Sequence, residues 1–304
     1  MTSPSITVLL ATYNGARYLP EQLASLAAQT LRPDRLVVRD DGSTDDGLRV
    51  VRDWGETQGI PVQWVPSTQR LGPAQSFLAA LRAVGVCDVT LFCDQDDVWL
   101  PHKVERAARA LATAPAGTPR LYASRLEIVD QTLAPLGLSP MPRHLGFETI
   151  ACESVLTGCT MAFNAPLAHL LASPPPDFMV MHDWWSALLA AGCGDIVYDP
   201  EPTLRYRQHA SNTLGAGPTG LRKLQARLAT FLGPDSAQRS RQLRELLRLH
   251  AAVLRPSARR LAEQLTSGAA HPARRVRAAL AAPLRRQSSV STLSTRLSLL
   301  INRF

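Results

Sequence analysis

Short apolar runs alternate with amphipathic stretches over the first 115 residues of the chain. Runs of four to six mostly apolar residues predict buried strands, and leucines that recur every three or four positions predict helices. The predicted strands are 6–11, 35–39, 61–65 and 88–93, and the predicted helices are 18–28, 45–54, 72–84 and 103–112. A strand–helix alternation of this spacing indicates a mostly parallel sheet with helices on both faces. Ligands of such sheets lie beyond the carboxyl ends of the strands.

The pattern is less regular from residue 116 to residue 217. The segment 135–143 is rich in proline and glycine and is expected to be a loop. The other predicted elements are one or two strands in 120–129, a strand in 157–164, a helix in 183–191, and two short strands, 195–198 and 203–207.

The composition changes close to residue 215. Residues 218–304 contain 17 lysines and arginines against three acidic residues, whereas residues 1–217 contain 16 against 22. Leucine, alanine and arginine dominate the second segment, and prolines separate its helix-like pieces. We therefore predict two parts, an acidic domain over 1–217 that can hold a metal ion and a basic helical extension over 218–304 that can meet an anionic surface.

The bulk composition is that of a globular protein, with 45% hydrophobic and 19% charged residues. No apolar run approaches the roughly 18 residues that span a bilayer, and 6–10 is too short for the core of a signal peptide. We expect a cytoplasmic protein. Its five cysteines form no C-x-x-C pair, which favours buried, reduced thiols over disulfides or a zinc site.

Carboxylates are concentrated after the predicted strand 88–93, in the sequence Cys93-Asp94-Gln95-Asp96-Asp97. Three carboxylates in four residues repel one another unless a cation neutralises them. Mg²⁺ and Mn²⁺ prefer carboxylate oxygens and keep coordination positions open for phosphate. We therefore predict a divalent-cation site here; an acidic surface turn is the alternative.

Polar turns follow the first two strands. Asp40-Asp41-Gly42-Ser43-Thr44-Asp45 follows 35–39, and Thr12-Tyr13-Asn14-Gly15 follows 6–11. Both are typical of turns, and Ser43 or Thr44 is a suitable helix N-cap. Asp40 and Asp41 also stand where a nucleotide base or ribose would lie in such a sheet.

The three stretches together resemble the family 2 glycosyltransferases, which have the GT-A fold. The resemblance rests on VLLATYNGARYLPEQLASLAAQT, VVRDDGSTDD and LFCDQDDVWLPHKV, and it covers about residues 5–215. The variant Asp-Gln-Asp-Asp-Val-Trp is similar to the bacterial rhamnosyltransferase branch. The resemblance implies a nucleotide-binding half over 1–115 and an acceptor half over 116–217.

The resemblance also implies roles for individual residues. Asp41 matches the residue that pairs with a pyrimidine base, and Asp96 matches the direct metal ligand. The nucleotide-sugar contacts implied are Ala11, Tyr13, Asn14, Asp40, Asp41, Asp94 and Gln95. Asp94 and His209 are further candidate metal ligands, in a site for Mg²⁺ or Mn²⁺.

His182-Asp183-Trp184-Trp185 matches the position of the family's general base, which would be Asp183. The alternative is that Asp183 only caps a helix. His182 departs from the acidic residue that the family often has there. His182, Arg207, Asp97, Trp99 and Trp184 are candidate contacts to the diphosphate or the acceptor, the tryptophans by stacking on sugar.

These roles imply an inverting transfer of a sugar from a nucleoside diphosphate to a hydroxyl of a glycan or lipid-linked glycan, in bacterial cell-surface polysaccharide synthesis. dTDP-L-rhamnose is the first donor expected, and UDP-hexoses or UDP-N-acetylhexosamines are the alternative. A sugar-1-phosphate nucleotidyltransferase would require a glycine-rich basic loop after 6–11, where only Gly15 stands.

Residues 218–304 can contact anionic membrane on its cytoplasmic face as amphipathic helices; the alternative is that these helices pack on their own domain and expose a solvated basic face. A non-catalytic sugar-nucleotide, nucleic-acid or membrane-binding protein that acts through this basic segment is the alternative of another class. We expect no nucleic-acid partner, because the segment contains only two aromatic residues, Phe231 and Phe304.

Overall fold

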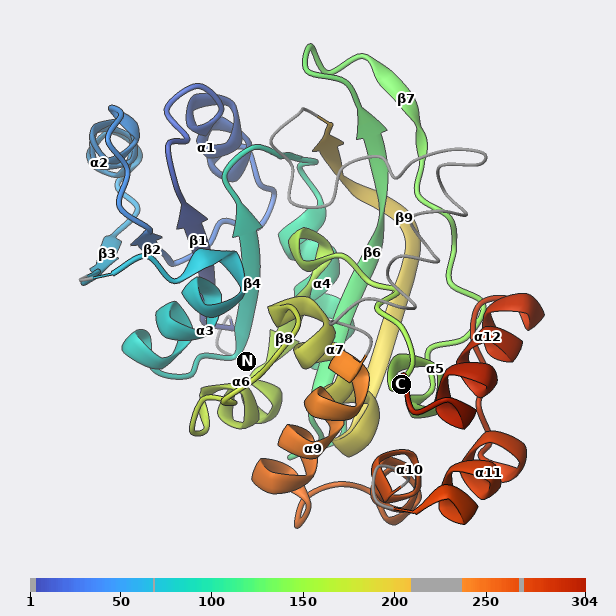
Figure 1. Cartoon of the computed structure of the whole chain (residues 1–304). Helices are drawn as coiled ribbons and strands as arrows, with labels where there is room; N and C mark the ends of the chain where they lie inside the picture. Colours follow the sequence, from blue (N-terminus) through green and yellow to red (C-terminus); the bar gives the residue numbers. More distant parts are fainter. Residues whose placement is uncertain (1–3, 68, 209–236, 268–270) are drawn as a thin grey trace.

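The computed structural model describes residues 4–67, 69–208, 237–267 and 271–304. Over this part of the chain nine strands form one mixed sheet in the order β3-β2-β1-β4-β8-β6-β9-β5, and β7 pairs with β6 (Figure 1). The strands are β1 (Ile6–Thr12), β2 (Arg35–Asp40), β3 (Val62–Val65), β4 (Val89–Asp94), β5 (Val98–Trp99), β6 (Arg120–Val129), β7 (Pro135–Leu138), β8 (Ala162–Asn164) and β9 (Asp195–Arg207). β1 to β4 are parallel, as predicted, and β8 runs antiparallel to β4.

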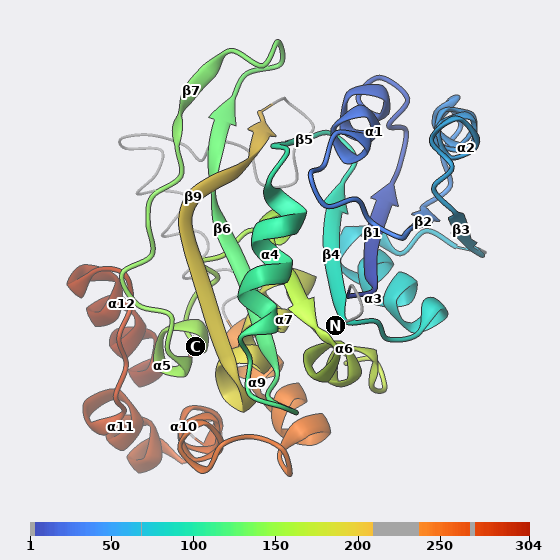
Figure 2. The ribbon, with the colours of Figure 1, turned by 180° about the vertical axis from the view of Figure 1, so that it is seen from behind.

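Helices cover both faces of the sheet. They are α1 (Leu19–Ala27), α2 (Gly47–Gln58), α3 (Gly72–Val84), α4 (Lys103–Ala112), α5 (Phe147–Ile150), α6 (Ala165–Ala172) and α7 (His182–Cys193). Alternate residues of β1 point to opposite faces, so Leu9 packs into one apolar core with α3 and α7, while Val8 and Leu10 pack into a second core with α1 and α4. Figure 2 shows α4 on the face opposite to α3, α6 and α7.

The middle of the chain differs from its prediction in three places. Residues 135–138 form strand β7 and not a loop; Pro135 opens this strand, where a missing amide is tolerated. The two strands predicted in 195–207 are one strand, β9, whose pairing with β6 shifts register after Ser124. Residues 158–160 are a 3₁₀ turn, so only β8 remains of the strand predicted over 157–164.

Four helices follow residue 237, in the segment predicted to be helical. They are α9 (Gln238–His250), α10 (Pro256–Thr266), α11 (Pro272–Ala281) and α12 (Ser289–Leu300). Leu243, Leu246 and Leu261 are buried in the core that α3, α6 and α7 share. The predicted boundary between 217 and 218 lies outside the described residues. None of the described helices combines the length and apolarity that crossing a bilayer requires.

All five cysteines are free, as predicted, and Cys93, Cys152 and Cys159 are buried. Burial raises the pKa of each of these three thiols. They are therefore protonated at neutral pH and pack as small apolar side chains.

Candidate active site

The carboxyl ends of three parallel strands bring the predicted site residues to one edge of the sheet. Ala11 on β1 is paired in register with Asp94 on β4, and Thr12 with Asp40 on β2. The turn after each strand therefore starts from the same edge. This placement follows from the parallel pairing, which sequence periodicity predicted.

A cavity of about 480 Å³ opens at this edge. It brings together nine of the predicted residues: Ala11, Tyr13, Asn14, Asp41, Asp94, Gln95, Asp96, His182 and Asp183. Its other lining residues are Thr12, Tyr18, Arg70, Gly72, Pro73, Ser76, Thr157, Gly158, Met181 and Tyr206.

Asp41 is held at one side of the cavity by backbone and guanidinium donors. The amides of Leu71 and Gly72 each donate to its carboxylate at 2.7 Å, and Arg39 pairs with it at 2.6 Å. Burial raises the pKa of Asp41, but these donors outweigh burial and bring the pKa below its usual value. Asp41 is therefore an ionised, fixed acceptor.

Arg70 and Tyr13 form the outer wall on the same side. The guanidinium carbon of Arg70 lies 3.8 Å from the centre of the Tyr13 ring, a cation–π contact. The Arg70 Nε also lies 3.9 Å from an Asp41 oxygen. These three side chains give this part of the cavity an aromatic face, a cation and an anion.

The turn after β1 is fixed by side chains from the two neighbouring strand ends. Asn14 has a left-handed backbone with φ of 48°, which asparagine tolerates better than most residues. Its side-chain oxygen accepts a hydrogen bond from the Thr44 amide at 2.8 Å, and its own amide donates to Ser43 Oγ. The predicted turn is thus present and is braced against the turn after β2.

Asp94, Asp96 and Asp183 line the middle of the cavity. Burial, together with the charges of Asp96 and Asp183, raises the pKa of Asp94 to about 7. Burial raises the pKa of Asp183 to about 6, against hydrogen bonds from the amides of Trp184 and Gly158. The carboxylates of Asp94 on β4 and of Asp183 at the start of α7 therefore repel each other. Such repulsion is typical of carboxylates that neutralise one bound cation together.

This donor set fits a hard divalent cation. Asp94 and Asp183 form no ion pair with a basic side chain in the described part of the chain, so no described cation relieves the repulsion between these two groups. Carboxylate oxygens are the ligands that Mg²⁺ and Mn²⁺ prefer. Asp94 and Asp96 would hold such an ion at the surface of the cavity.

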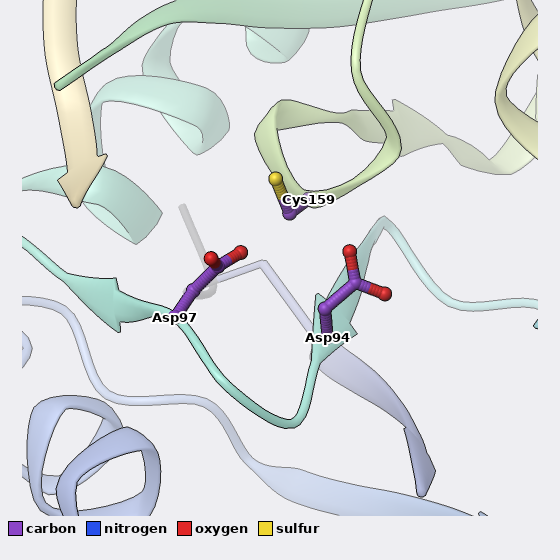
Figure 3. Close-up of side chains that lie close together, drawn as sticks. All are labelled: Asp94, Asp97 and Cys159. Atoms are coloured by element: carbon purple, nitrogen blue, oxygen red, sulfur yellow. The ribbon is translucent and has the colours of Figure 1, made fainter. Parts of the chain in front are cut away.

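Asp94 also belongs to a second set of possible ligands, together with Asp97 and Cys159 (Figure 3). One ligand atom each of Asp94, Asp97 and Cys159 falls within 4.8 Å of the others. Asp97 and Cys159 are buried, and burial raises the pKa of both groups well above their usual values. Burial disfavours the thiolate of Cys159 and the carboxylate of Asp97, the charged forms that would bind a metal ion, which favours the Asp94–Asp96 side.

His182 lines the cavity as an uncharged ring. It lies between Phe77 and Phe92, at centroid distances of 4.3 and 4.8 Å. Burial lowers its pKa to about 3, and neither ring nitrogen has a hydrogen-bond partner in the described part of the chain. A Cβ on Gly158 would come within 2.6 Å of His182 Nε2, so this ring position requires glycine at 158.

Asp183 is not the helix cap that the alternative interpretation required. The N-cap of α7 is Met181, and Asp183 is the second helical residue. Its carboxylate accepts a hydrogen bond from the Trp184 amide at 2.6 Å and still lines the cavity. Its position is therefore compatible with contact to a bound acceptor.

Several predicted contacts are contradicted by the structure. Trp99 and Trp184 are buried away from the cavity, the first beside Lys103 and the second donating to the Ile150 carbonyl, so neither can stack on a sugar. Asp97 and Arg207 are also buried outside the cavity lining. Hydrophobic packing and backbone hydrogen bonds hold these residues in the interior.

Arg207 and Asp40 have local structural partners instead. Arg207 pairs with Glu21 and donates to the carbonyls of Asp96 and Gln131, which ties β9 to the turn after β4. Asp40 accepts hydrogen bonds from the amides of Gly42 and Ser43 and shapes the turn after β2. His209 lies outside the described residues.

Four residues line the cavity without having been predicted from the sequence, namely Arg70, Ser76, Gly158 and Tyr206. Arg70 lies just before α3, which begins at Gly72 and Pro73. A basic residue directly before a helix start in an acidic domain is the feature of the sequence that could have identified it. Gly158 carries no comparable signal, because segments distant in sequence bring it to the site. Tyr206 opens the sequence Tyr206-Arg207-Gln208-His209, in which only Arg207 and His209 were candidates.

Comparisons with known proteins agree with this geometry. The family model described as glycosyl transferase family 2 matches residues 7–153. An uncharacterized glycosyltransferase of Nostoc is 34% identical over 36% of this chain, and the match spans only about a third, 33%, of that relative. The dTDP-rhamnosyl transferase RfbG of Shigella flexneri is 27% identical over 68% of this chain and 74% of its own length.

Solved structures share the fold at low sequence identity. TarS 1–349 of S. aureus, in complex with UDP, has a TM-score of 0.60 at 16% identity and covers 98% of this chain and 88% of its own. The mannosyltransferase PcManGT of Pyrobaculum calidifontis, in complex with GDP-Man and Mn²⁺, has a TM-score of 0.52 at 19% identity and covers 100% and 89%. Residues 7–153 are thus similar to glycosyl transferase family 2, and the shared architecture shows that the chain has the GT-A fold.

Proposed function

We propose that this protein is a metal-dependent, inverting glycosyltransferase that moves a sugar from a nucleoside diphosphate to a hydroxyl acceptor. The observation that carries the proposal is the convergence of Asp41, Asp94, Asp96 and Asp183 on one cavity. The match of residues 7–153 to the family model supports the reaction class.

The nucleotide would lie at the Asp41 side of the cavity. The Oδ2 atom of Asp41 accepts one close hydrogen bond, from Gly72, so it retains a lone pair for the ring N–H of a pyrimidine. Tyr13 and Arg70 offer an aromatic face and a cation beside it. This arrangement suits uracil and thymine equally, so the base alone does not select the donor.

The leaving diphosphate would lie over Asp94 and Asp96. A divalent cation bound there would supply positive charge that stabilises the departing diphosphate. Asp183 would accept the proton of the acceptor hydroxyl as that oxygen attacks the anomeric carbon. A direct displacement of this kind inverts the configuration and needs no covalent intermediate.

dTDP-L-rhamnose is the first donor that we propose. The similarity to RfbG, which is described as a dTDP-rhamnosyl transferase, supports this choice. UDP-N-acetylhexosamines or UDP-hexoses are the alternative, which the fold shared with TarS, solved with UDP-GlcNAc, keeps open. The proposed acceptor is a glycan or lipid-linked glycan of a cell-surface polysaccharide, reached at the cytoplasmic face of a membrane that residues 218–304 contact.

A donor panel tests the proposal. The purified chain is incubated with dTDP-rhamnose, UDP-glucose, UDP-galactose or UDP-N-acetylglucosamine, with Mn²⁺ or with EDTA, and its melting temperature and the released nucleotide are measured. We expect one donor to stabilise the chain and to be hydrolysed slowly, with Mn²⁺ only.

Asp96→Asn should abolish both responses, whereas Asp53→Asn, an exposed residue of α2 outside the cavity, should leave them unchanged. Hydrolysis that persists in EDTA would contradict the role of the metal. A lack of response to every donor with Mn²⁺ present would favour a non-catalytic protein.

A further inference from the structure

The last two helices carry a row of exposed apolar side chains. On α12, Val290, Leu293 and Leu297 recur every three or four residues and are 74%, 59% and 49% exposed. This spacing places them on one side of the helix. The apolar row, which continues on α11 and at the end of α12, consists of Val276, Leu280, Val290, Leu293, Leu297, Leu300 and Ile301.

The opposite sides of these helices hold them to the rest of the protein. Ala278 and Ala279 of α11 and Leu299 of α12 are buried. The guanidinium of Arg296 donates to the carbonyls of Ala279, Leu280 and Ala282, which joins α12 to the end of α11. Figures 1 and 2 both show the two helices side by side at one edge of the molecule. The apolar row therefore stands on a fixed platform and not on a loose segment.

The same segment is strongly basic. Residues 264–304 contain seven arginines and no acidic residue. A cavity of about 420 Å³ lies at the start of α12 and brings Arg285, Arg286 and Arg296 together with Arg143 and His144 from the chain after β7. Four guanidinium groups around one cavity favour an anionic ligand.

Two of these arginines are available to a ligand. Arg286 is engaged by Glu153 at 2.6 Å, and Arg296 by the carbonyls at the end of α11. The guanidiniums of Arg143 and Arg285 are exposed and make no hydrogen bond to any residue that the structure describes. The first turn of α12 adds amide groups, whose partial positive charge favours phosphate.

We propose that α11 and α12 form a docking surface for a bilayer of anionic phospholipid. A lipid phosphate occupies the arginine cavity, and the apolar row enters the boundary between headgroups and acyl chains. An aliphatic row beside guanidiniums matches the two layers of such a membrane, whereas a nucleic acid offers nothing for the aliphatic side chains. The membrane contact proposed above would thus be made through α11 and α12. Binding at this surface does not depend on the transfer reaction.

Flotation of the full-length chain with vesicles tests the inference. Vesicles of phosphatidylcholine alone are compared with vesicles that also contain phosphatidylglycerol. We expect binding to the second kind only. Arg143→Gln/Arg285→Gln should weaken this binding about thirty-fold, because each basic residue near such a surface contributes roughly a factor of five to the affinity. Leu293→Gln/Leu297→Gln should weaken it at least about tenfold.

Arg49→Gln/Arg52→Gln is the matched control, because it removes the same charge from the exposed side of α2. Equal flotation of this control and of Arg143→Gln/Arg285→Gln would overturn the arginine cavity as the lipid site. Inorganic phosphate is the soluble probe: a melting shift that needs Arg143 and Arg285, without flotation of the wild type, would assign the cavity to a free anion and overturn the proposal.

A dimer in sedimentation that Leu293→Gln/Leu297→Gln dissolves, again without flotation, would assign the apolar row to a second copy of the chain and equally overturn it. Donor hydrolysis without vesicles should be unchanged in all these variants. Failure of the donor panel alone would contradict the proposed transferase reaction, and failure of flotation alone would contradict the docking surface.

Discussion

The side-chain amide of Gln95 forms two hydrogen bonds with the backbone of Tyr13. Its oxygen accepts a hydrogen bond from the Tyr13 amide at 2.8 Å, and its nitrogen donates to the Tyr13 carbonyl at 3.1 Å. The same oxygen accepts from Thr12 Oγ1 at 2.8 Å. A residue of the acidic motif thus holds the turn after β1, and a Cβ at Gly15 would displace this side chain because it would lie 2.3 Å from the Gln95 oxygen.

Loss of this contact should loosen the nucleotide side of the site. We expect Gln95→Ala to raise the KM for the donor roughly tenfold, which corresponds to about 1.4 kcal/mol, because the turn must be ordered on binding. Donor titrations of the two proteins measure it. Gln63→Ala, on the exposed side of β3, is the matched control, and an unchanged KM in Gln95→Ala would show that the turn is held without this side chain.

Asp183 should govern the acid limb of the pH profile. Burial raises its pKa to about 6, so the carboxylate that accepts a proton is lost as the pH falls below that value. We expect kcat to fall about tenfold per pH unit there. Asp183→Asn should lower kcat by roughly 10²–10⁴ with little change in donor affinity.

The stability of the same variant separates a catalytic from a structural role. A carboxyl whose pKa is raised by folding stabilises the protein below its unfolded pKa, near 3.8, and this stability is lost as the pH rises through about 6. Asp183→Asn, uncharged throughout, should therefore be more stable than wild type at pH 8, by about 1–3 kcal/mol in urea denaturation. A less stable variant would indicate that Asp183 mainly supports the start of α7.

The carboxylate cluster predicts a metal response that depends on pH. Burial and the neighbouring charges of Asp96 and Asp183 raise the pKa of Asp94 to about 7. In EDTA the melting temperature should fall as the pH rises from about 5 to about 8, because Asp94 ionises beside other anions. Mn²⁺ should reverse the fall and bind more tightly at the higher pH, with release of protons. Calorimetry in buffers of different ionisation enthalpy measures that release; Mn²⁺ binding that is independent of pH would contradict it.

A buried network away from the site should contribute to folding. Asp199 accepts hydrogen bonds from Arg106 Nε and Nη2 and from the Tyr122 hydroxyl, each at 2.7 Å. Tyr122→Phe removes one hydrogen bond to a charged group and should cost about 1.5–3 kcal/mol in urea denaturation. Donor KM should stay unchanged, because this network joins β6, β9 and α4 and does not line the cavity. An unchanged midpoint would show that solvent replaces the hydroxyl.

Local sequence determined the regular elements and the residues that end each strand. Helices α3 and α4 occupy the predicted ranges, since apolar side chains recur there at helical spacing. The acidic motif and the two polar turns could be placed at one sheet edge for the same reason, because parallel strands end together. β7 could not be predicted, because a short exposed edge strand buries no apolar face and leaves no periodic signal.

Only the tertiary structure decided which of the candidate side chains face the cavity. Trp99, Trp184 and Arg207 have the residue types of a sugar- and phosphate-binding site, yet packing places all three in the interior. Conversely, the segment before α3 brings Arg70 against Tyr13, and the turn before β8 brings Gly158 against His182. The direction in which a side chain points depends on contacts between segments far apart in sequence, and local pattern carries no information about those contacts.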